Sequence, residues 1–434
     1  MRTLKASLAI VVATAQIGGQ SVSDQVRQRT GFDLAPSISE APATFSLPPG
    51  VTSTERLSAR DAVAIALWNN ADLQADLAAL DVSRTELTEA ALFKNPSFST
   101  LFAVGPKPFE FLLAWPIEEL WQRKQRVKAA QLNVDSVATG LVQNGLNLIR
   151  DVRLAYTDLW FAESRARILQ DSSDLRGRIA AFAQKRRDAG DGTGLDVSLA
   201  RADSQSNAEL ARMSLADVEV IRAHLRYLLG LRQQDRPLSI AVQPSAPPQP
   251  LPPISVLFET AASNRPDLRA AEISVQAAAE KAKWERSQVL AMLAPTLSIK
   301  EVGTDGLRAG PGLNMEIPIL SRNQGRISRA DAEVVRSGKL YAALRARIEH
   351  EVVDAYVRAQ QAQTALIQLQ QQVRPAVEQS IQLSQRAYEN GDIILLSVLE
   401  ASRQRHDLDL REAEVSAALQ RALAELERAV GKSL

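Results

Sequence analysis

The sequence predicts a mainly α-helical protein with a small β part, built from one unit of about 200 residues that occurs twice. Three observations predict this fold class. The run from Glu118 to Ala189 contains no proline and is rich in helix-forming residues. Landmark residues recur at a nearly constant offset along the chain. Short stretches of alternating apolar residues, which are typical of strands, separate the helical runs within each unit.

The composition of the 434-residue chain narrows the possible functions. There is no cysteine and there are only three histidines, so disulfides and thiolate sites are excluded and a His-rich metal site is not expected. The 51 lysines and arginines nearly balance the 50 aspartates and glutamates, which gives no reason to expect nucleic acid as a partner. Neither a phosphate-binding loop nor a supported Ser/His/Asp set is present. We therefore expect no enzyme, no cofactor and no metal site.

The first residues have the pattern of a secretory signal. Arg2 and Lys5 form a basic head, an apolar stretch follows, and Ala13-Thr14-Ala15 fits a small-x-small cleavage site. The alternative is a frayed N-terminal helix. Beyond this segment the chain has no apolar run of the roughly 20 residues that a spanning helix needs. A membrane crossing would therefore have to be made by strands.

The duplication rests on matched pairs of short segments. Trp115-Pro116-Ile117 matches Ile317-Pro318-Ile319, Ala155-Tyr156 matches Ala355-Tyr356, and Gly190-Asp191 matches Gly391-Asp392. Six prolines between Pro244 and Pro253 predict an extended linker that cannot be helical. The predicted organisation is a signal peptide (1–15), an N-terminal extended or equatorial segment (16–56), a first repeat (57–243), the linker (244–253) and a second repeat (254–434).

Within each repeat we expect a helix, a β-hairpin and a long helical hairpin. The first helices are expected from Asp61 to Phe93 and from Pro266 to Leu293, and the longest from Glu118 to Ala189, roughly 100 Å if it is continuous. Its counterpart from Arg322 to Asn390 contains only Pro375. Nine positions follow the spacing of a coiled-coil seam: Ile327, Ala330, Val334, Tyr341, Leu344, Ile348, Val352, Ala355 and Ala359. Because many are alanines that bury little area, such helices need further neighbours, and we expect self-association.

The hairpins are expected over residues 97–117 and 296–319. Phe98, Thr100, Phe102 and Val104 alternate onto one face, as do Phe109, Phe111, Leu113 and Trp115, and the second hairpin offers Leu297, Ile299, Glu301, Leu313, Met315 and Ile317. Five of the ten phenylalanines lie between Phe93 and Phe111, which suits a wall facing lipid. A soluble hairpin packed on helices is the alternative. Since four strands cannot close a transmembrane barrel, the first interpretation requires several chains.

Further motifs complete a resemblance to the TolC-like outer-membrane efflux factors. They are Asn264-Arg265-Pro266-Asp267-Leu268, Tyr388-Glu389-Asn390-Gly391 and Ser397-Val398-Leu399-Glu400-Ala401. Val26-Arg27-Gln28-Arg29-Thr30-Gly31 resembles the heavy-metal, RND-type efflux branch of that family. The resemblance covers essentially the whole mature chain. It implies a homotrimer in which three protomers of four strands each form one 12-stranded transmembrane β-barrel, continued by a trimeric α-barrel tunnel.

This resemblance implies an outer-membrane channel of a tripartite efflux pump in a Gram-negative bacterium, a passive conduit for drugs or metal ions. Its implied partners are outer-membrane lipid, a periplasmic adaptor (membrane fusion) protein and an inner-membrane pump of the RND type. Without cysteine, no lipid anchor is expected. The alternatives are the exit duct of a type I secretion system and a soluble periplasmic coiled-coil scaffold or adaptor.

The resemblance also assigns candidate site residues at the ends of the helical hairpins. The tips expected to contact the adaptor are Gly190, Asp191, Gly192, Thr193 and Gly194 in the first repeat, and Gly391, Asp392, Ile393 and Ile394 in the second. The residues expected at the periplasmic aperture are Asp196, Tyr388, Ser397 and Glu400, with Tyr388 bonded to Asp196 in the closed state. The alternative is that these are ordinary reversal loops and solvated helix residues.

Overall fold

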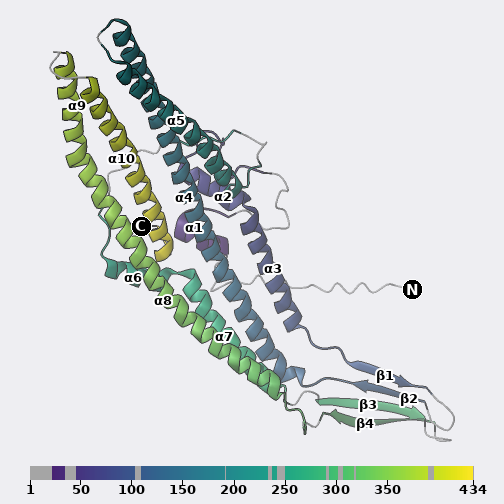
Figure 1. Cartoon of the computed structure of the whole chain (residues 1–434). Coiled ribbons are helices and arrows are strands. Elements are labelled where there is room, and N and C mark those ends of the chain that lie inside the picture. Colours follow the sequence, from purple (N-terminus) through teal and green to yellow (C-terminus); the bar gives the residue numbers. More distant parts are fainter. Residues whose placement is uncertain are drawn as a thin grey trace. The chain divides into compact units, whose positions relative to one another are not determined.

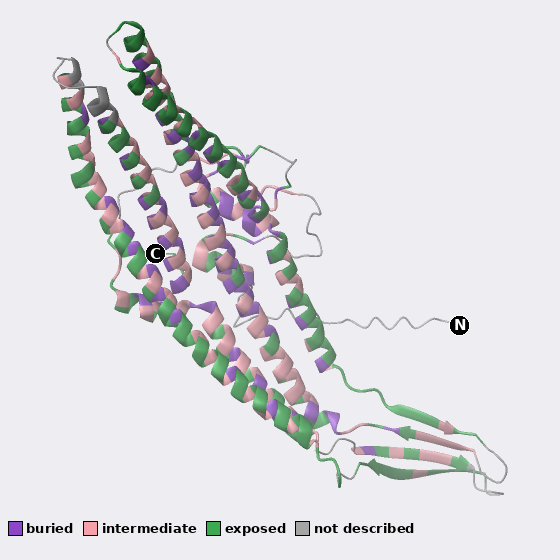
Figure 2. Ribbon diagram, viewed as in Figure 1, coloured by how far each residue is buried: buried purple, intermediate pink, exposed green. Residues whose placement is uncertain are grey.

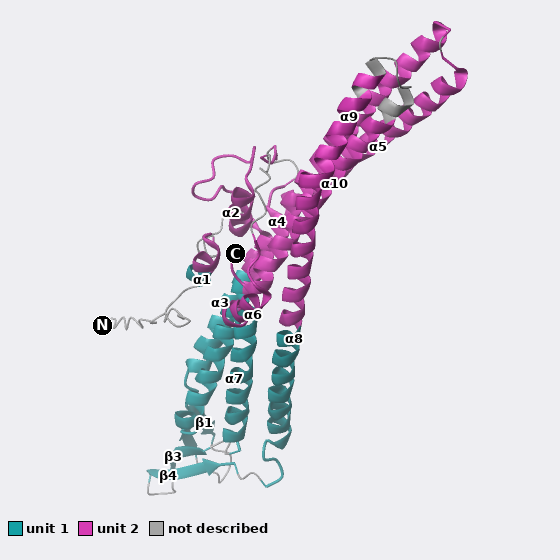
Figure 3. Cartoon of the chain, turned by 90° about the vertical axis from the view of Figure 1, so that its left-hand side faces the viewer, with its two compact units in different colours: residues 1–25, 76–142, 266–346 teal, residues 26–75, 143–265, 347–434 magenta. Residues whose placement is uncertain are grey.

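The computed structural model describes residues 22–34, 45–102, 109–190, 192–232, 237–241, 250–289, 293–301, 306–316, 319–389 and 395–433. The predicted signal peptide, residues 244–249 of the linker and the turns of both β-hairpins lie outside these ranges. The boundaries predicted for the repeats stay predictions. By spatial contact the chain forms two compact units, each of which draws on both halves of the sequence (Figure 3). Unit 1 comprises Met1–Gln25, Asp76–Val142 and Pro266–Ala346, and unit 2 comprises Val26–Ala75, Gln143–Arg265 and Arg347–Leu434.

The predicted class, mainly α with a small β part, is confirmed (Figure 1). The first part of the chain gives α1 (Val22–Thr30), α2 (Ala59–Asn69), α3 (Ala71–Ala91), β1 (Ser97–Leu101), β2 (Glu110–Ala114), α4 (Glu119–Asp188) and α5 (Gly194–Leu228). The second part gives α6 (Ile254–Asn264), α7 (Pro266–Ser287), β3 (Leu293–Glu301), β4 (Leu307–Met315), α8 (Gln324–Gln368), a π-helical segment (Leu369–Val373), α9 (Arg374–Glu389) and α10 (Leu395–Val430).

The two longest helical runs differ in continuity. α4 is one uninterrupted helix of 70 residues, as its lack of proline predicts. Its counterpart passes through the π-helical segment immediately before Pro375. Proline has no backbone N–H for the carbonyl four residues earlier, and its ring crowds that carbonyl, so the preceding turn widens. Arg374, at the end of the irregular segment, donates to Asp409 (3.0 Å) and Glu412 (2.9 Å) of α10 and ties the two helices together.

The helix expected from Asp61 to Phe93 is broken at Asn70, whereas the helix expected from Pro266 begins at that residue as predicted. Asn70 separates α2 from α3 with ψ of 122°, and its side-chain oxygen accepts from the backbone N–H of Leu73 (2.9 Å), which starts α3. Arg265 separates α6 from α7 with ψ of 119°, because the following Pro266 disfavours a helical conformation before it. The second helix is also shorter than predicted, since Leu293 begins β3.

The two breaks are held in the same way in both repeats. The Asn70 amide donates to Leu228 O (3.0 Å), and the Arg265 guanidinium donates to Ala429 O (3.2 Å). The glycines that follow these carbonyls both have positive φ, +69° at Gly230 and +83° at Gly431. A Cβ at Gly230 would lie 2.4 Å from Asn69 O, and one at Gly431 would lie 3.1 Å from Asn264 O. The end of each long hairpin therefore packs on the break in its own repeat, which is structural support for the duplication.

Tyr156 bonds to the two chain segments at the ends of the first repeat, one before α2 and one after α5. This buried tyrosine of α4 donates its hydroxyl proton to Leu57 O (2.9 Å) or Ala241 O (3.0 Å), and Leu57 forms a parallel bridge with Ile240. Burial raises the pKa of Tyr156 to about 12, so the hydroxyl stays a donor at ordinary pH. The segments before α2 and after α5 are therefore fastened to the middle of α4.

The predicted seam of α8 is the less exposed side of that helix (Figure 2). Ala330, Ile348, Val352, Ala355 and Ala359 are buried, and the other four predicted positions are half-buried. In unit 2 the seam continues as Ala362 and Leu366, which pack with Val415 and Leu419 of α10. A three- and four-residue apolar spacing thus predicted the packed face correctly.

The close approach at Gly230 gives a stability prediction. Gly230→Ala is expected to lower the free energy of unfolding by about 3 kcal/mol, since it adds a backbone clash to a left-handed conformation. Gly190→Ala is the matched control, because Gly190 has φ of +87° but no atom within 4 Å of its added Cβ, and should cost only about 1 kcal/mol. Denaturant midpoints of the helical circular-dichroism signal in detergent would measure both. Equal losses would contradict the packing argument.

Candidate functional site

The strands form one antiparallel sheet in the order β1-β2-β3-β4, within unit 1. Phe98 pairs with Leu113, which pairs with Leu297, and Leu297 pairs with Pro311. Directly paired residues point to the same face of a sheet, so the register decides how the two hairpins combine their faces. The outer strands β1 and β4 each have one edge without a partner strand in this sheet.

The register gives the sheet one apolar and one polar face. The apolar face collects Phe98, Thr100, Phe111, Leu113, Leu293, Pro295, Leu297, Ile299, Leu307, Ala309, Pro311, Leu313 and Met315, with Glu301 at the end of β3 as its charged member. The opposite face collects Ser97, Ser99, Glu110, Thr296, Ser298, Lys300, Arg308 and Asn314, with Leu101, Leu112, Ala114, Ala294 and two glycines among them. Phe98 and Phe111 stack with ring centroids 5.7 Å apart. Within the four described strands, the alternating residues predicted from the sequence therefore share one face.

The apolar face is not covered by the rest of the described chain. Phe98 is 64% exposed, Leu313 63% and Leu307 67%. Exposure of a continuous apolar face to water is unfavourable in free energy. The exposed face therefore indicates contact with lipid or with another chain. At the junction with the helices, Trp115, Leu120, Trp121, Ile319 and Leu320 are exposed as well. Exposed tryptophans beside an apolar surface are typical of the boundary between membrane and water.

The buried carboxylate of Glu119 joins the segments around the first β-hairpin. Glu119, whose side chain is 2% exposed, pairs with Arg126 (2.9 Å) and with Lys94 (3.0 Å), while Arg126 also donates to Ala90 O (2.9 Å). Burial raises the pKa of Glu119, but the hydrogen bonds from Arg126 and Lys94 outweigh it and leave the pKa below its usual range. Because Lys94 follows α3, Glu119 joins the segments on either side of the first hairpin.

The tip of the first helical hairpin is well described, apart from Asp191. Gly190 adopts φ of +87° and ends α4. A Cβ at Gly192 would lie 3.0 Å from the backbone nitrogen of Arg187, so this turn needs glycine for close approach. Thr193 caps α5, because its hydroxyl accepts from the N–H of Asp196 (3.1 Å). The close approach of Gly192 and the Thr193 cap therefore favour a tight reversal at the predicted docking tip.

Asp196 completes the capping box of α5. Its carboxylate accepts from the Thr193 hydroxyl (2.7 Å) and from the Thr193 N–H (3.2 Å), and the side chain is exposed. These hydrogen bonds from the side chain and the backbone of Thr193 lower the pKa of the Asp196 carboxyl. Its described contacts are therefore with its own helix. The predicted Tyr388–Asp196 bond stays a prediction.

The second tip is described only in part. Tyr388 and Ser397 lie in α9 and α10, but their side chains lie outside the described part of the structure, and Glu400 is exposed on α10. Gly391, Asp392, Ile393 and Ile394 also lie outside it. All four predicted aperture residues belong to unit 2, at the hairpin ends of their helices, and their roles stay predictions.

The sequence analysis missed an apolar pair at the first tip. Leu195 is 68% exposed and Leu199 61% exposed, whereas Val197 between them is 2% exposed. The spacing of four residues places both leucines on one side of α5, next to the glycine turn. An i, i+4 leucine pair directly after a helix cap was the signal that could have found them. This pair gives the tip a described apolar surface.

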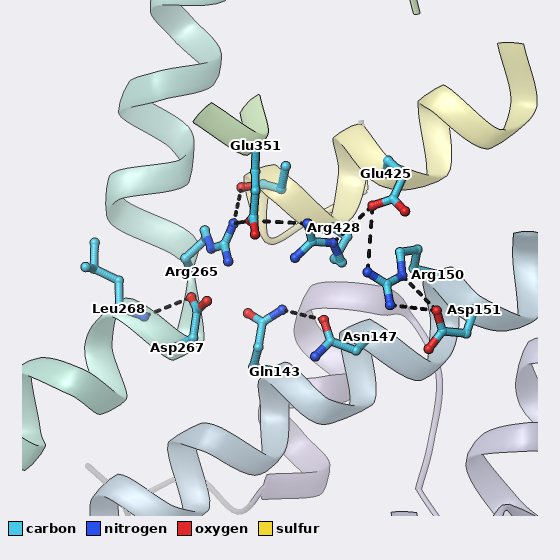
Figure 4. Close-up of polar contacts among 11 residues, drawn as sticks. Gln143, Asn147, Arg150, Asp151, Arg265, Asp267, Leu268, Glu351, Glu425 and Arg428 are labelled. Atoms are coloured by element: carbon cyan, nitrogen blue, oxygen red, sulfur yellow. Dashed lines mark hydrogen bonds and ion pairs between the residues drawn. The ribbon is translucent and has the colours of Figure 1, made fainter. Parts of the chain in front are cut away.

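A network of ion pairs joins four helices in the middle of unit 2 (Figure 4). Arg265, whose side chain is 2% exposed, pairs with Glu351 of α8 (2.6 Å), and Glu351 also pairs with Arg428 of α10 (3.1 Å). Arg428 donates to Glu425 (3.2 Å), which lies 3.8 Å from Arg150 of α4. Because a buried guanidinium without a carboxylate is costly, this network fixes the α6–α7 break against the long helices.

No described helix combines the length and apolar character that a bilayer crossing requires. Among the same residues, no three or more His, Asp or Glu side chains gather where they could hold a metal ion.

Sequence comparison relates the chain to efflux proteins. Residues 257–432 match the family described as outer membrane efflux protein. The chain is 25% identical over 382 residues to the cobalt-zinc-cadmium resistance protein CzcC of Cupriavidus metallidurans, a match that covers 87% of this chain and 90% of CzcC. It is 26% identical over 322 residues to the outer membrane efflux protein BepC of Brucella suis, covering 71% of this chain and 66% of BepC.

Solved structures with the same fold include CusC, which is described as forming a transmembrane channel, and the outer membrane protein VceC. CusC superposes with a TM-score of 0.72 at 19% identity, over 92% of this chain and all of CusC. VceC of Vibrio cholerae gives 0.68 at 16% identity, over 86% of this chain and 96% of VceC. The fold is therefore the one that CusC and VceC share. The predicted resemblance to the outer-membrane efflux proteins is thus confirmed as a similarity in sequence and in fold.

The buried Arg265 leads to a stability prediction. Glu351→Gln should lower the free energy of unfolding by about 3 kcal/mol, since it removes the carboxylate from a buried cation. Asp354→Asn, on the same helix, removes only an exposed pair with Arg358 and should cost less than about 0.5 kcal/mol. Chemical unfolding of both variants in detergent would measure the difference. Similar losses would show that the network contributes little.

Proposed function

We propose that this chain is the outer-membrane channel component of a tripartite efflux pump in a Gram-negative bacterium. The observation that carries this proposal is the two-faced sheet, whose exposed apolar side suits lipid and whose polar side suits a water-filled passage. Similarity to channel structures over about nine-tenths of the chain supports the same conclusion. A soluble scaffold would leave the exposed apolar face without a role, so that alternative is not favoured.

The proposed assembly is a homotrimer. The free edges of β1 and β4 carry unpaired backbone groups, which in a membrane must be satisfied by hydrogen bonds to other strands. Three copies that join these edges would share one membrane-spanning wall. The partners proposed for the helical-hairpin tips are a periplasmic adaptor and, beyond it, an inner-membrane pump of the RND type. The exposed Leu195 and Leu199 support a contact surface at the first tip.

Asp196, Tyr388, Ser397 and Glu400 are proposed to line the periplasmic aperture. Threefold symmetry would place three copies of each carboxylate around one passage, which raises the local cation concentration and repels anions. The lowered pKa of Asp196 keeps it ionised at physiological pH. The proposed cargo is therefore cationic, with divalent metal ions favoured by the similarity to CzcC, which is named for cobalt, zinc and cadmium resistance.

The first test of the proposed function is conductance. The purified protein in a planar lipid bilayer is expected to give discrete, cation-preferring conductance steps, and Asp196→Asn should reduce that preference. Glu86→Gln, which removes an exposed carboxylate of α3, should leave it unchanged. A protein that partitions into the soluble fraction and never conducts would refute the channel.

The pKa of Asp196 also predicts a pH dependence. Its folded pKa lies below the unfolded value of about 3.9, so the cap and its negative charge are present above that value and are lost only as the pH falls through the lower folded pKa. Cation preference, measured from reversal potentials in a salt gradient, should therefore be constant from pH 8 to about pH 5. A loss of preference near pH 6 would assign the selectivity to another group.

The two faces of the sheet can be tested on neighbouring residues of β3. Leu297→Arg places a charge on the apolar face and should destabilise the membrane-inserted protein by about 2 to 3 kcal/mol. Ser298→Arg places the same charge on the polar face and should have a much smaller effect. Folding yields into phospholipid vesicles would compare them. The reverse order would mean that the sheet faces are assigned wrongly.

A further inference from the structure

A basic groove lies between α7 and α8 in unit 1, close to the ends of these helices that connect to the sheet. Its volume is about 450 Å³. Its lining residues are Ala278, Lys281, Glu285, Arg326, Arg329, Ala330, Glu333 and Arg336. Four of these side chains are cationic and two are anionic. The groove thus carries an excess of positive charge in a chain whose total charge is nearly zero.

The two carboxylates of the groove already have partners. Glu285 accepts from the Asn323 side-chain amide (3.1 Å), and Glu333 pairs with Arg336 (2.8 Å). Within the described ranges, Lys281, Arg326 and Arg329 form no ion pair with a carboxylate. Three cations are therefore available to an anion that enters the groove.

Arg326 and Arg329 lie near the start of α8, where a bound anion would stabilise the fold. Arg326 and Arg329 lie within about 8 Å of the helix start at Gln324, and the first turn contains no acidic residue. The start of a helix carries a partial positive charge, so cations there are unfavourable unless an anion neutralises them. The start of α4 differs, because its first turn contains the acidic Glu119. The charge placement at the start of α8 is unfavourable for the isolated fold.

The groove also lies beside the predicted membrane boundary. α7 ends at Ser287, shortly before β3, and α8 begins at Gln324, shortly after β4. Trp115, Trp121 and Leu320 are exposed at this junction. In a membrane protein, cations just beyond the aromatic boundary lie at the depth of the lipid phosphates.

We propose that the groove formed by Lys281, Arg326 and Arg329 binds the phosphate group of an anionic phospholipid from the adjacent leaflet. This inference rests on the proposed function, because it requires the sheet to be in a membrane. The planar guanidinium of arginine donates two parallel hydrogen bonds to phosphate oxygens, and the flexible lysine adds a third charge. The bound headgroup would fix the depth of the protein in the bilayer.

The test is a titration of the purified, delipidated protein in neutral detergent with fluorescent phosphatidylglycerol. The triple variant Lys281→Gln, Arg326→Gln, Arg329→Gln should bind about a hundredfold more weakly, which corresponds to about fivefold for each cation. Arg329→Gln alone should show the fivefold loss and guards against misfolding of the triple variant. The matched control Arg178→Gln, Lys185→Gln, Arg187→Gln removes three exposed cations outside the groove and should bind as the wild type does.

Competition identifies the source of the phosphate. Phosphatidylcholine and inorganic phosphate should displace the probe only at far higher concentrations than phosphatidylglycerol. Equal affinities of the wild type and both groove variants would overturn the proposal, and displacement by inorganic phosphate at the same low concentration would replace it with a free-anion site. Bilayer conductance of the wild type is measured in parallel. Conductance without groove-dependent binding refutes this inference alone, whereas no conductance refutes the proposed function.

Discussion

The burial of the Arg265 guanidinium is the constraint on which much of unit 2 depends. A buried cation requires carboxylate and carbonyl partners, and here they come from Glu351 of α8 and Ala429 of α10. The requirement fixes the register of two long helices against the short α6. Since alanine-rich seams bury little area, such polar contacts decide which of several similar registers the helices adopt. The apolar seam stabilises the contact between the helices, and the Arg265 contacts select one register of that contact.

The two repeats solve the same structural problem with different chemistry. At the equivalent position of the first repeat, Asn70 bonds to Leu228 O with a neutral amide and needs no carboxylate. Because a neutral amide holds the break in the first repeat and a charged guanidinium holds it in the second, the two repeats need not be equally stable. Both repeats share the glycine contact: Gly230 and Gly431 each lie against the backbone of an asparagine. The side chains around those contacts were free to differ.

The sequence predicted the features that depend on local pattern. The absence of proline located α4, and alternation assigned Phe98, Leu113 and Leu297 to one face, because both signals act within a few residues. The break at Asn70 was not predicted, since the amide's partner Leu228 lies 158 residues away. At the candidate site, the Thr193-x-x-Asp196 spacing is that of a capping box, a local signal that the prediction of these residues as tip and aperture did not use. The pairing of Arg265 with Glu351 depends on tertiary packing and has no signal in the sequence.

The π-helical segment before Pro375 distributes mechanical stiffness unequally between the two hairpins. Because α4 is a continuous helix, it bends little and transmits a displacement along its length. The second hairpin contains the irregular segment Leu369–Val373, and the pairs of Arg374 with Asp409 and Glu412 hold the end of that segment against α10. A force applied at the tips would therefore be absorbed in the second repeat, with the first repeat serving as the fixed frame.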